Sequence, residues 1–321
     1  MSPHAVRELS IRDFPPTPPV DTLASNASAE DIVAALARAG GCVVKNFVAV
    51  DTIEKLKRDF YPLLDAETDG WSGSFFSNAS RRVTGCCSKS LSFAEEIVGH
   101  PLWNEVCNIL LSSTHTSYTQ YEQVTFTSGP QICNTTVYSI LPGSEEQALH
   151  RDDRIHHAHL PAAHQHTVGR DFGVGLFVAG TKCTQENGAT RFIPGSHLWD
   201  YSAPPPKDHV PAYAVMEPGD AFLMLSGCYH GASANVTTRD QPDNERLLFG
   251  TFFTKATLRQ EENQYLASDL SVIKNYPDHI LRLMGFDISK PFLGWVDMAS
   301  PMAAIRKETK LQKSSGESHL L

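Results

Sequence analysis

Two polar residues placed two positions apart, His150 and Asp152, have the side chains and the spacing to bind a metal ion. On a β-strand, residues i and i+2 project from the same face, so the imidazole and the carboxylate could share one ion. Asp153 would project from the opposite face, which makes Asp152 the better candidate. A His-x-Asp pair also occurs at many ordinary strand ends, so the pair becomes informative only together with a further ligand.

A further histidine, His230, follows the apolar run 221–225 and is itself followed by a glycine. A strand formed by that run could bring His230 opposite His150 and Asp152. Two histidines and one carboxylate on one face form the facial triad of non-haem Fe(II) oxygenases, which leaves positions on the ion open for substrate and O2. The three residues therefore predict an iron site of this kind.

An arginine, Arg246, begins the apolar run 247–254 that comes after His230. A guanidinium inside a β-barrel is costly unless it meets an anion, and arginine holds a carboxylate through two parallel hydrogen bonds. The distal carboxylate of 2-oxoglutarate would fit, whereas the alternative is an exposed arginine at a strand start. Arg239 lies in a polar loop and is expected to be solvated.

The elements that must carry these residues follow from hydrophobic patterning. Short apolar or alternating runs, separated by Pro, Gly, Asn and Asp, cover 121–127, 131–141, 172–178, 189–193, 212–216, 220–225 and 247–254. This pattern is typical of an all-β sandwich or barrel. The region of about 121–254 is therefore expected to form a β core.

Helices are expected on both sides of this core. A capping box at 28–31 begins one amphipathic helix, and a second capping signal at 51–54 begins another. A helix is also predicted over 101–112, and 260–310 has a partly helical pattern. The Ser- and Gly-rich region 70–100 is predicted to be loop.

The two ends of the chain are predicted to lie outside the folded part. Prolines forbid a helix in 1–27, which is expected to be a flexible N-terminal arm, and the polar residues 311–321 are expected to fray. The rest, 28–310, is predicted to form one domain.

Composition limits the possible functions. The chain has 321 residues, of which 41% are hydrophobic, and its 27 Lys and Arg against 36 Asp and Glu give a net charge of −9. No nucleic-acid or membrane partner is expected from such a charge, and no apolar run approaches the ~18 residues of a membrane span. Without a signal-peptide core, the chain is expected to be cytoplasmic. Its seven cysteines contain no CxxC pair and are expected to be free thiols.

Several motifs occur in the order found in one enzyme family. They are Gly41–Val48 after the first helix, Gln147-x-x-His150-x-Asp152, the Asn-Gly … Pro-Gly-Ser-His signature of Asn187–His197, Pro218–Asp220, and Phe292–Trp295. With these motifs, residues of about 30–300 resemble the phytanoyl-CoA hydroxylase (PhyH) family of Fe(II)/2-oxoglutarate-dependent dioxygenases. The closest texture within the family is that of fungal enzymes that tailor meroterpenoids and alkaloids.

The resemblance implies a mainly β fold with flanking helices around a double-stranded β-helix (jelly-roll, cupin-like) core. It implies that His150, Asp152 and His230 bind Fe(II), that Arg246 holds the C5 carboxylate of 2-oxoglutarate, and that Gln147 hydrogen-bonds this co-substrate. O2 is then the oxidant, and ascorbate is expected to stimulate turnover. The interval from His230 to Arg246 is longer than is usual in the family, which predicts a loop insertion around 240–244.

The expected reaction is oxidation of an unactivated C–H bond in a bulky, mostly apolar natural product. Hydroxylation, desaturation and rearrangement all remain open, whereas halogenation is disfavoured because halogenases of this class lack the carboxylate ligand. Candidate pocket residues are Phe75, Phe76, Tyr121, Thr135, Val137, Leu149 and Phe222. The histidine-rich run 156–166 invites a second-metal interpretation, but a solvated loop explains it better.

Two other functions remain open at this point. One is a catalytically silent paralogue that supports an active subunit, because failure of Arg246 to hold 2-oxoglutarate would produce it. The other is a cupin-like enzyme that uses another metal and no co-substrate. Relatives are often dimers, so a homodimer or a heterodimer with a paralogue is expected.

Overall fold

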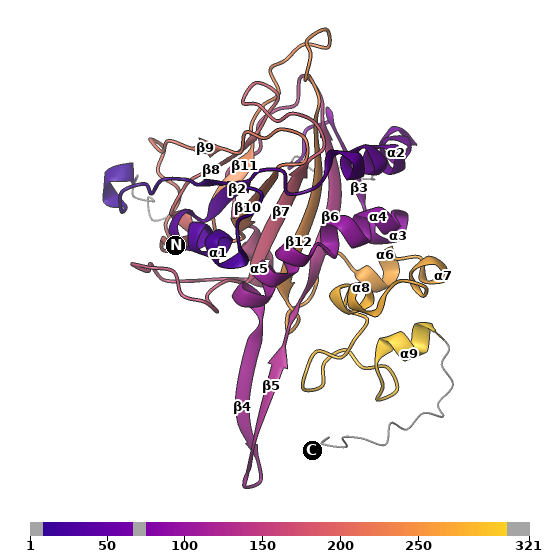
Figure 1. The fold of residues 1–321 in the computed structure, drawn as a ribbon. Helices are drawn as coiled ribbons and strands as arrows, with labels where there is room; N and C mark the ends of the chain where they lie inside the picture. Colours follow the sequence, from indigo (N-terminus) through magenta and orange to yellow (C-terminus); the bar gives the residue numbers. More distant parts are fainter. Residues whose placement is uncertain (1–8, 67–74, 307–321) are drawn as a thin grey trace, which may run out of the picture.

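A seven-stranded sheet forms the centre of the molecule in the computed structural model, which describes residues 9–66 and 75–306 (Figure 1). The strand order is β1-β2-β10-β7-β12-β6-β3, and all neighbours are antiparallel except β1 and β2. The strands are β1 (Thr22–Leu23), β2 (Gly41–Val44), β3 (Ser80–Thr84), β6 (Pro130–Ile140), β7 (Gly173–Ala179), β10 (Ala221–Leu225) and β12 (Arg246–Lys255).

A second, smaller sheet has the order β11-β8-β9. Its strands are β8 (Thr190–Phe192), β9 (Ala212–Tyr213) and β11 (His230–Ala232). The backbone of Gln147 and His150 extends this sheet, because each donates a hydrogen bond of 2.9 Å to a carbonyl of β11. The two sheets form a jelly-roll, as the sequence predicted.

Alternate residues of the central strands pack into two separate hydrophobic cores. Val174, Leu176 and Val178 of β7 pack on the side that faces the helices, whereas Phe177 and Ala179 pack inside the jelly-roll. The same alternation divides β10 and β12. Because both faces of these strands are covered, they appear in the sequence as continuous apolar runs rather than as alternating ones.

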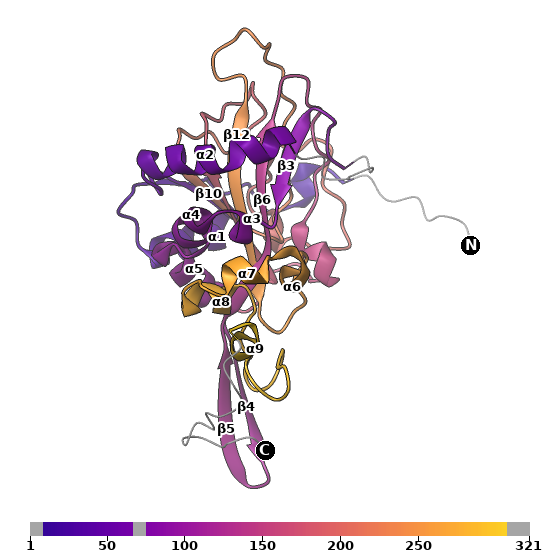
Figure 2. The ribbon, with the colours of Figure 1, turned by 90° about the vertical axis from the view of Figure 1, so that its right-hand side faces the viewer.

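Helices cover the outer face of the large sheet (Figure 2). The longest are α1 (Ala29–Ala39), α2 (Val50–Ala66) and α5 (Pro101–Leu111). The shorter helices form two groups. Between α2 and α5 lie α3 (Cys86–Lys89), α4 (Leu91–Phe93) and a π-helix (Ala94–Val98); after β12 come α6 (Gln264–Ala267), α7 (Leu270–Ile273), α8 (Asp278–Leu283) and α9 (Pro301–Ile305).

The capping signal that predicted α1 is present. The hydroxyl of Ser28 accepts a hydrogen bond from the backbone of Asp31, whose carboxylate accepts one from the backbone of Ser28. Gly40 ends the helix with a φ of 78°, and a Cβ there would lie 2.7 Å from Nδ1 of His197. This position therefore needs glycine both for its backbone conformation and for its close packing.

A two-stranded hairpin, β4 (Ser113–Thr119) and β5 (Glu122–Ser128), extends away from the rest of the molecule (Figures 1 and 2). The run 121–127 was predicted as a strand of the β core, but it belongs to this hairpin. Tyr121 was proposed for the substrate pocket and is instead 96% exposed next to the turn. Alternation of polar and apolar residues identifies a strand but not the sheet that the strand joins.

Two further expectations differ from the structure. Part of the predicted loop 70–100 forms β3 and the helices after it; β3 contains two arginines, yet pairs with β6 through its backbone. Part of the expected N-terminal arm is packed, since β1 joins the large sheet and the ring of Phe14 lies 4.1 Å from that of Trp199. Residues 1–8 and the expected frayed tail at 311–321 lie outside the described residues.

Candidate active site

The two histidines of the predicted triad are brought face to face by the smaller sheet. His150 and His230 form an antiparallel bridge, in which each backbone N–H donates to the carbonyl of the other at 2.9 and 3.0 Å. Their ring centroids are 4.5 Å apart. Nδ1 of His150 lies 2.8 Å from the carbonyl of Ala148, and Nδ1 of His230 lies 3.0 Å from that of Cys228.

These two backbone contacts determine which nitrogen is available for a metal. A carbonyl oxygen can only accept, so both Nδ1 atoms carry the proton and donate it. Nε2 of each ring is then the atom with a free lone pair. Such hydrogen bonds to the second ring nitrogen are what usually orient a metal-binding histidine.

Asp152 meets the histidines from a turn rather than from a strand. It begins a 3-10 helix, Asp152–His156, so the predicted strand geometry for His150 and Asp152 is wrong, although the two side chains do converge. Its Oδ1 lies 3.3 Å from Nε2 of His150, and its Oδ2 lies 3.4 Å from Nε2 of His230. Asp153 points away, as expected, and accepts a 2.6 Å hydrogen bond from Tyr201.

The ligand atoms of the three residues all lie within 4.8 Å of one another, and no other group of this kind was found among the described residues. Oδ2 of Asp152 is buried and accepts no hydrogen bond. Burial by itself would raise the pKa of Asp152, but the positive charge of the neighbouring imidazoles, when they carry a second proton, outweighs it and holds that pKa below its ordinary value. Burial lowers the pKa of His230. An ionised carboxylate and a neutral imidazole are the forms that bind a divalent metal ion.

Arg246, the first residue of β12, is 3% exposed and lines the same pocket as the triad. Its only hydrogen bond to a described side chain is to Oγ1 of Thr190, at 3.1 Å, and its Nε has no partner. No carboxylate of the described residues forms an ion pair with it, and burial lowers its pKa. The guanidinium is therefore a buried cation whose counter-ion must come from outside the described chain.

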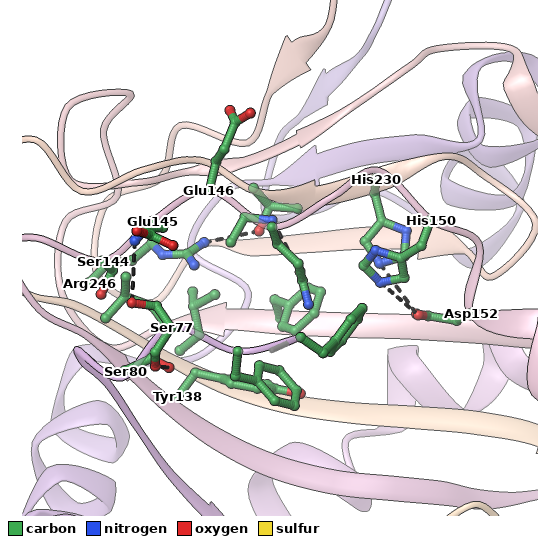
Figure 3. Close-up of a pocket in the computed structure, with 18 of the residues that line it drawn as sticks. Ser77, Ser80, Tyr138, Ser144, Glu145, Glu146, His150, Asp152, His230 and Arg246 are labelled. Atoms are coloured by element: carbon green, nitrogen blue, oxygen red, sulfur yellow. Dashed lines mark hydrogen bonds and ion pairs between the residues drawn. The ribbon is translucent and has the colours of Figure 1, made fainter. Parts of the chain in front are cut away.

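The pocket runs between these two features, with Arg246 and the triad pointing into it from opposite ends (Figure 3). Its volume is about 510 Å³. Gln147 also lines it, and its Oε1 accepts a 3.3 Å hydrogen bond from the backbone of Ala232. Arg239, the rival arginine, is exposed and does not line the pocket. The donor set thus fits a metal ion at one end and a carboxylate at the other.

Some of the predicted pocket residues line the pocket, and others do not. Phe75 and Phe76 line the pocket, and the ring of Phe75 lies 4.9 Å from that of His150. On β6, the predicted residues Thr135 and Val137 face away from it, because Asn134, Tyr138 and Ile140 occupy the other face of the strand. Phe222 packs against Phe192 inside the core, and Leu149 does not line the pocket either.

Other residues that line the pocket were missed. Among them are Ser77, Asn134, Tyr138, Phe177, Thr190, Leu248, Phe252 and Glu261. The alternation of β6 and β12 limits each strand to two sets of residues, but only a three-dimensional contact shows which set faces inward. Glu261 lies beyond the last core strand and carries no local signal.

The histidine-rich loop forms no second metal group among the described residues. Nε2 of His156 lies 3.3 Å from Oγ1 of Thr254, and Nε2 of His166 lies 2.6 Å from a carboxylate oxygen of Asp171.

All seven cysteines are free thiols, as predicted, and all are buried. Among the described residues, no helix is long and apolar enough to cross a membrane.

Several known proteins are similar to this chain. The family model described as Phytanoyl-CoA dioxygenase (PhyH) matches residues 36–242. The dioxygenase cnsJ of Penicillium expansum is 36% identical over 302 residues, covering 93% of this chain and 89% of that protein. The dioxygenase himG of Aspergillus japonicus is 38% identical over 289 residues, covering 87% of each protein.

Among solved structures, the crystal structure of SnoN, a non-haem α-ketoglutarate-dependent epimerase from nogalamycin biosynthesis, has a TM-score of 0.53. It covers 74% of this chain and 88% of its own, with 19% identity, and supports the jelly-roll fold alone. Taken with the family match, the class is that of the non-haem Fe(II)/2-oxoglutarate-dependent dioxygenases, as the sequence motifs predicted. The chain belongs to the PhyH family.

Proposed function

We propose that His150, Asp152 and His230 hold Fe(II), that Arg246 and Gln147 hold 2-oxoglutarate, and that the enzyme oxidises an unactivated C–H bond of a bulky secondary metabolite. The observation that carries this proposal is a buried guanidinium that no described carboxylate pairs with, facing a group of three potential metal ligands across one pocket. An unpaired buried cation is tolerated only where a ligand neutralises it. The dicarboxylate 2-oxoglutarate can contact both ends at once.

Each residue then has a defined task. The backbone carbonyls of Ala148 and Cys228 hold the imidazoles with Nε2 toward the metal, and Asp152 supplies the negative ligand. Arg246 binds the distal carboxylate in a dry environment, where the attraction is strong. Iron and 2-oxoglutarate, when bound, supply the oxidising chemistry that a protein side chain cannot. The protein orients them and excludes water.

The pocket walls indicate a bulky, largely apolar substrate. The rings of Tyr138, Phe177 and Phe252 form a continuous wall, with centroids 6.2 and 5.2 Å apart, and Phe75 stands beside the triad. We propose a terpenoid, meroterpenoid or alkaloid as the substrate class. The relatives cnsJ and himG are both fungal dioxygenases, which supports a role in fungal secondary metabolism.

Anaerobic spectroscopy tests this proposal directly. Metal-free protein is loaded with Fe(II) and 2-oxoglutarate, and a weak visible metal-to-ligand charge-transfer band is expected from chelation by the co-substrate. The band should vanish in Asp152→Ala. Iron-bound, folded protein without the band would overturn the assignment and favour a silent subunit that supports an active partner.

The dimer and the cytoplasmic location predicted from the sequence also stay proposals. Light scattering of the purified chain over a range of concentrations tests the homodimer, and a strictly monomeric result would favour a paralogue as partner. Fluorescent tagging of the full chain in a fungal host tests the compartment.

A further inference from the structure

We infer that Glu261 recognises a positively charged nitrogen on the substrate, so that the enzyme selects natural products that carry a basic amine. The inference rests on the proposed function and deepens it. Glu261 lines the main pocket and also a smaller adjoining cavity, and it shares both with Asn134, Asp152 and Phe252. It therefore lies at the triad end of the pocket, where the substrate must meet the iron site.

The segment that carries Glu261 is anchored by its neighbour. The carboxylate of Glu262 accepts hydrogen bonds from the backbone of Gly85 at 2.5 Å, from Thr135, and from Nε2 of Gln264 at 2.6 Å. The backbone N–H of Glu262 donates to the carbonyl of Cys133 at 3.0 Å. These hydrogen bonds hold the segment of Glu262 against β6, so its carboxylate has a structural role.

Glu261 has no comparable structural task. Its carboxylate accepts a hydrogen bond from Nδ2 of Asn134, and no other hydrogen bond or ion pair to it is found among the described residues. Glu261 is an exposed residue, yet enough protein surrounds its carboxylate that burial raises its pKa, with the negative charge of Asp152 adding to the effect. The exposed Arg154 opposes this rise but forms no ion pair with it.

Charge balance indicates what Glu261 needs. In the proposed complex, the divalent iron and Arg246 together offset Asp152 and the two carboxylates of 2-oxoglutarate. The remaining acidic residues of the pocket wall are Glu145, Glu146 and Glu261; of these, Glu146 is already paired with Arg191. Glu145 and Glu261 form no ion pair among the described residues, although Arg154 acts on Glu261 from a distance. Glu261 is the one at the substrate end, where a substrate cation could pair with it.

The aromatic wall favours the same class of ligand. Phe252 lines both cavities beside Glu261, and its ring is one end of the wall formed with Phe177 and Tyr138. Aromatic faces attract ammonium groups, and they also pack the apolar body of a natural product. A carboxylate placed beside several rings therefore suits an amine on a hydrophobic skeleton better than it suits a neutral terpene.

Three probes of equal length test the inference: 4-phenylbutylamine, 4-phenylbutanol and 4-phenylbutyrate. Binding is measured by anaerobic calorimetry on the protein loaded with Fe(II) and 2-oxoglutarate, and again on the metal-free protein. The amine is expected to bind roughly 10- to 100-fold more tightly than the alcohol, as for a hydrogen bond to a charged group. On the loaded protein, where 2-oxoglutarate occupies Arg246, equal affinity for amine and alcohol, tighter binding of the butyrate, or no binding of any probe would overturn the inference.

Substitutions at Glu261 and Glu145 test which residue causes the preference for the amine. Glu261→Gln keeps the shape and should abolish the preference for the amine, whereas Glu261→Asp should keep part of it. Glu145→Gln removes the same charge at the Arg246 end of the pocket and should keep the preference (Figure 3). An amine preference that survives in Glu261→Gln would overturn the assignment. The charge-transfer band separates the two proposals: it should persist in Glu261→Gln, and its absence from the wild-type protein would count against the proposed function alone.

Discussion

The two ends of the pocket are constructed in different ways. At the metal end, two backbone carbonyls, at Ala148 and Cys228, orient His150 and His230 before any ion arrives. At the other end, Arg246 is buried, and the described side chains give it one hydrogen bond and no counter-ion. The first end is preorganised by its own backbone, whereas the second is a charged group that only a ligand completes. Substitutions should therefore act differently at the two ends.

The largest effect is expected from His150→Ala. It removes one metal ligand, and Fe(II) affinity should fall more than about 100-fold, since even hydrogen-bond partners of metal ligands are worth about 10- to 100-fold. Iron content after dialysis and the charge-transfer band measure the loss. His156→Ala is the matched control from the same segment and should retain both; equal loss in the two variants would show that the site is merely fragile.

A more selective loss, confined to the co-substrate, is expected from Arg246→Met at the opposite end. Half-saturation by 2-oxoglutarate should need at least about 100-fold more co-substrate, because breaking a buried ion pair costs about 3–5 kcal/mol. Fe(II) affinity should be unchanged. Thermal unfolding gives a second readout, since the variant without 2-oxoglutarate should be as stable as the wild type or more so. A destabilised variant would indicate that Arg246 supports the fold instead.

A smaller effect at the Arg246 end of the pocket is expected from Thr190→Val. It removes the hydroxyl that accepts from Arg246 and keeps the shape of the side chain. One hydrogen bond is worth about 1 kcal/mol, so half-saturation by 2-oxoglutarate should rise by roughly 5-fold. Titration of the charge-transfer band measures it. A loss as large as that of Arg246→Met would mean that the hydroxyl positions the guanidinium.

The folded state should become less stable in acid, because of a buried histidine. His197 follows β8, its Nε2 lies 3.1 Å from the carbonyl of Ala37, and burial lowers its pKa from 6.5 to about 4. Between these values the unfolded chain binds a proton that the folded chain does not, so stability falls as pH falls. From pH 7 to pH 5 this amounts to about 2 kcal/mol. Urea unfolding at both values measures it, and His197→Asn should reduce the difference; an unchanged difference would exclude His197 as its source.

The site was more predictable from the sequence than the pocket around it. The structure brings His150, Asp152 and His230 together and places Arg246 in the same pocket, as expected from the few residue types that can bind iron or a carboxylate. The turn at Asp152 was missed, because a spacing of two fits a strand and a tight turn equally well. Local pattern gives the order of chemical groups along the chain but not the path of the backbone between them.

The residues of the pocket walls show more clearly what sequence pattern cannot predict. On β6 the sequence indicated a strand, yet Thr135 and Val137 were chosen where Asn134 and Tyr138 face the pocket. Both faces of that strand are buried, so hydrophobicity does not distinguish them. A shift of one residue exchanges the two sets, and the pairing of β6 with β12 and β3 decides which set turns inward.

The sequence by itself determined the family, the jelly-roll class and the residue types of the candidate metal site, because capping boxes, apolar runs and chemically rare ligands are local properties. Only the tertiary structure decided that Glu261 reaches the pocket wall while Glu262 anchors the chain. The two glutamates are adjacent and chemically identical in the sequence. What separates them is the set of atoms that folding brings to each carboxylate, and those atoms come from strands more than a hundred residues away.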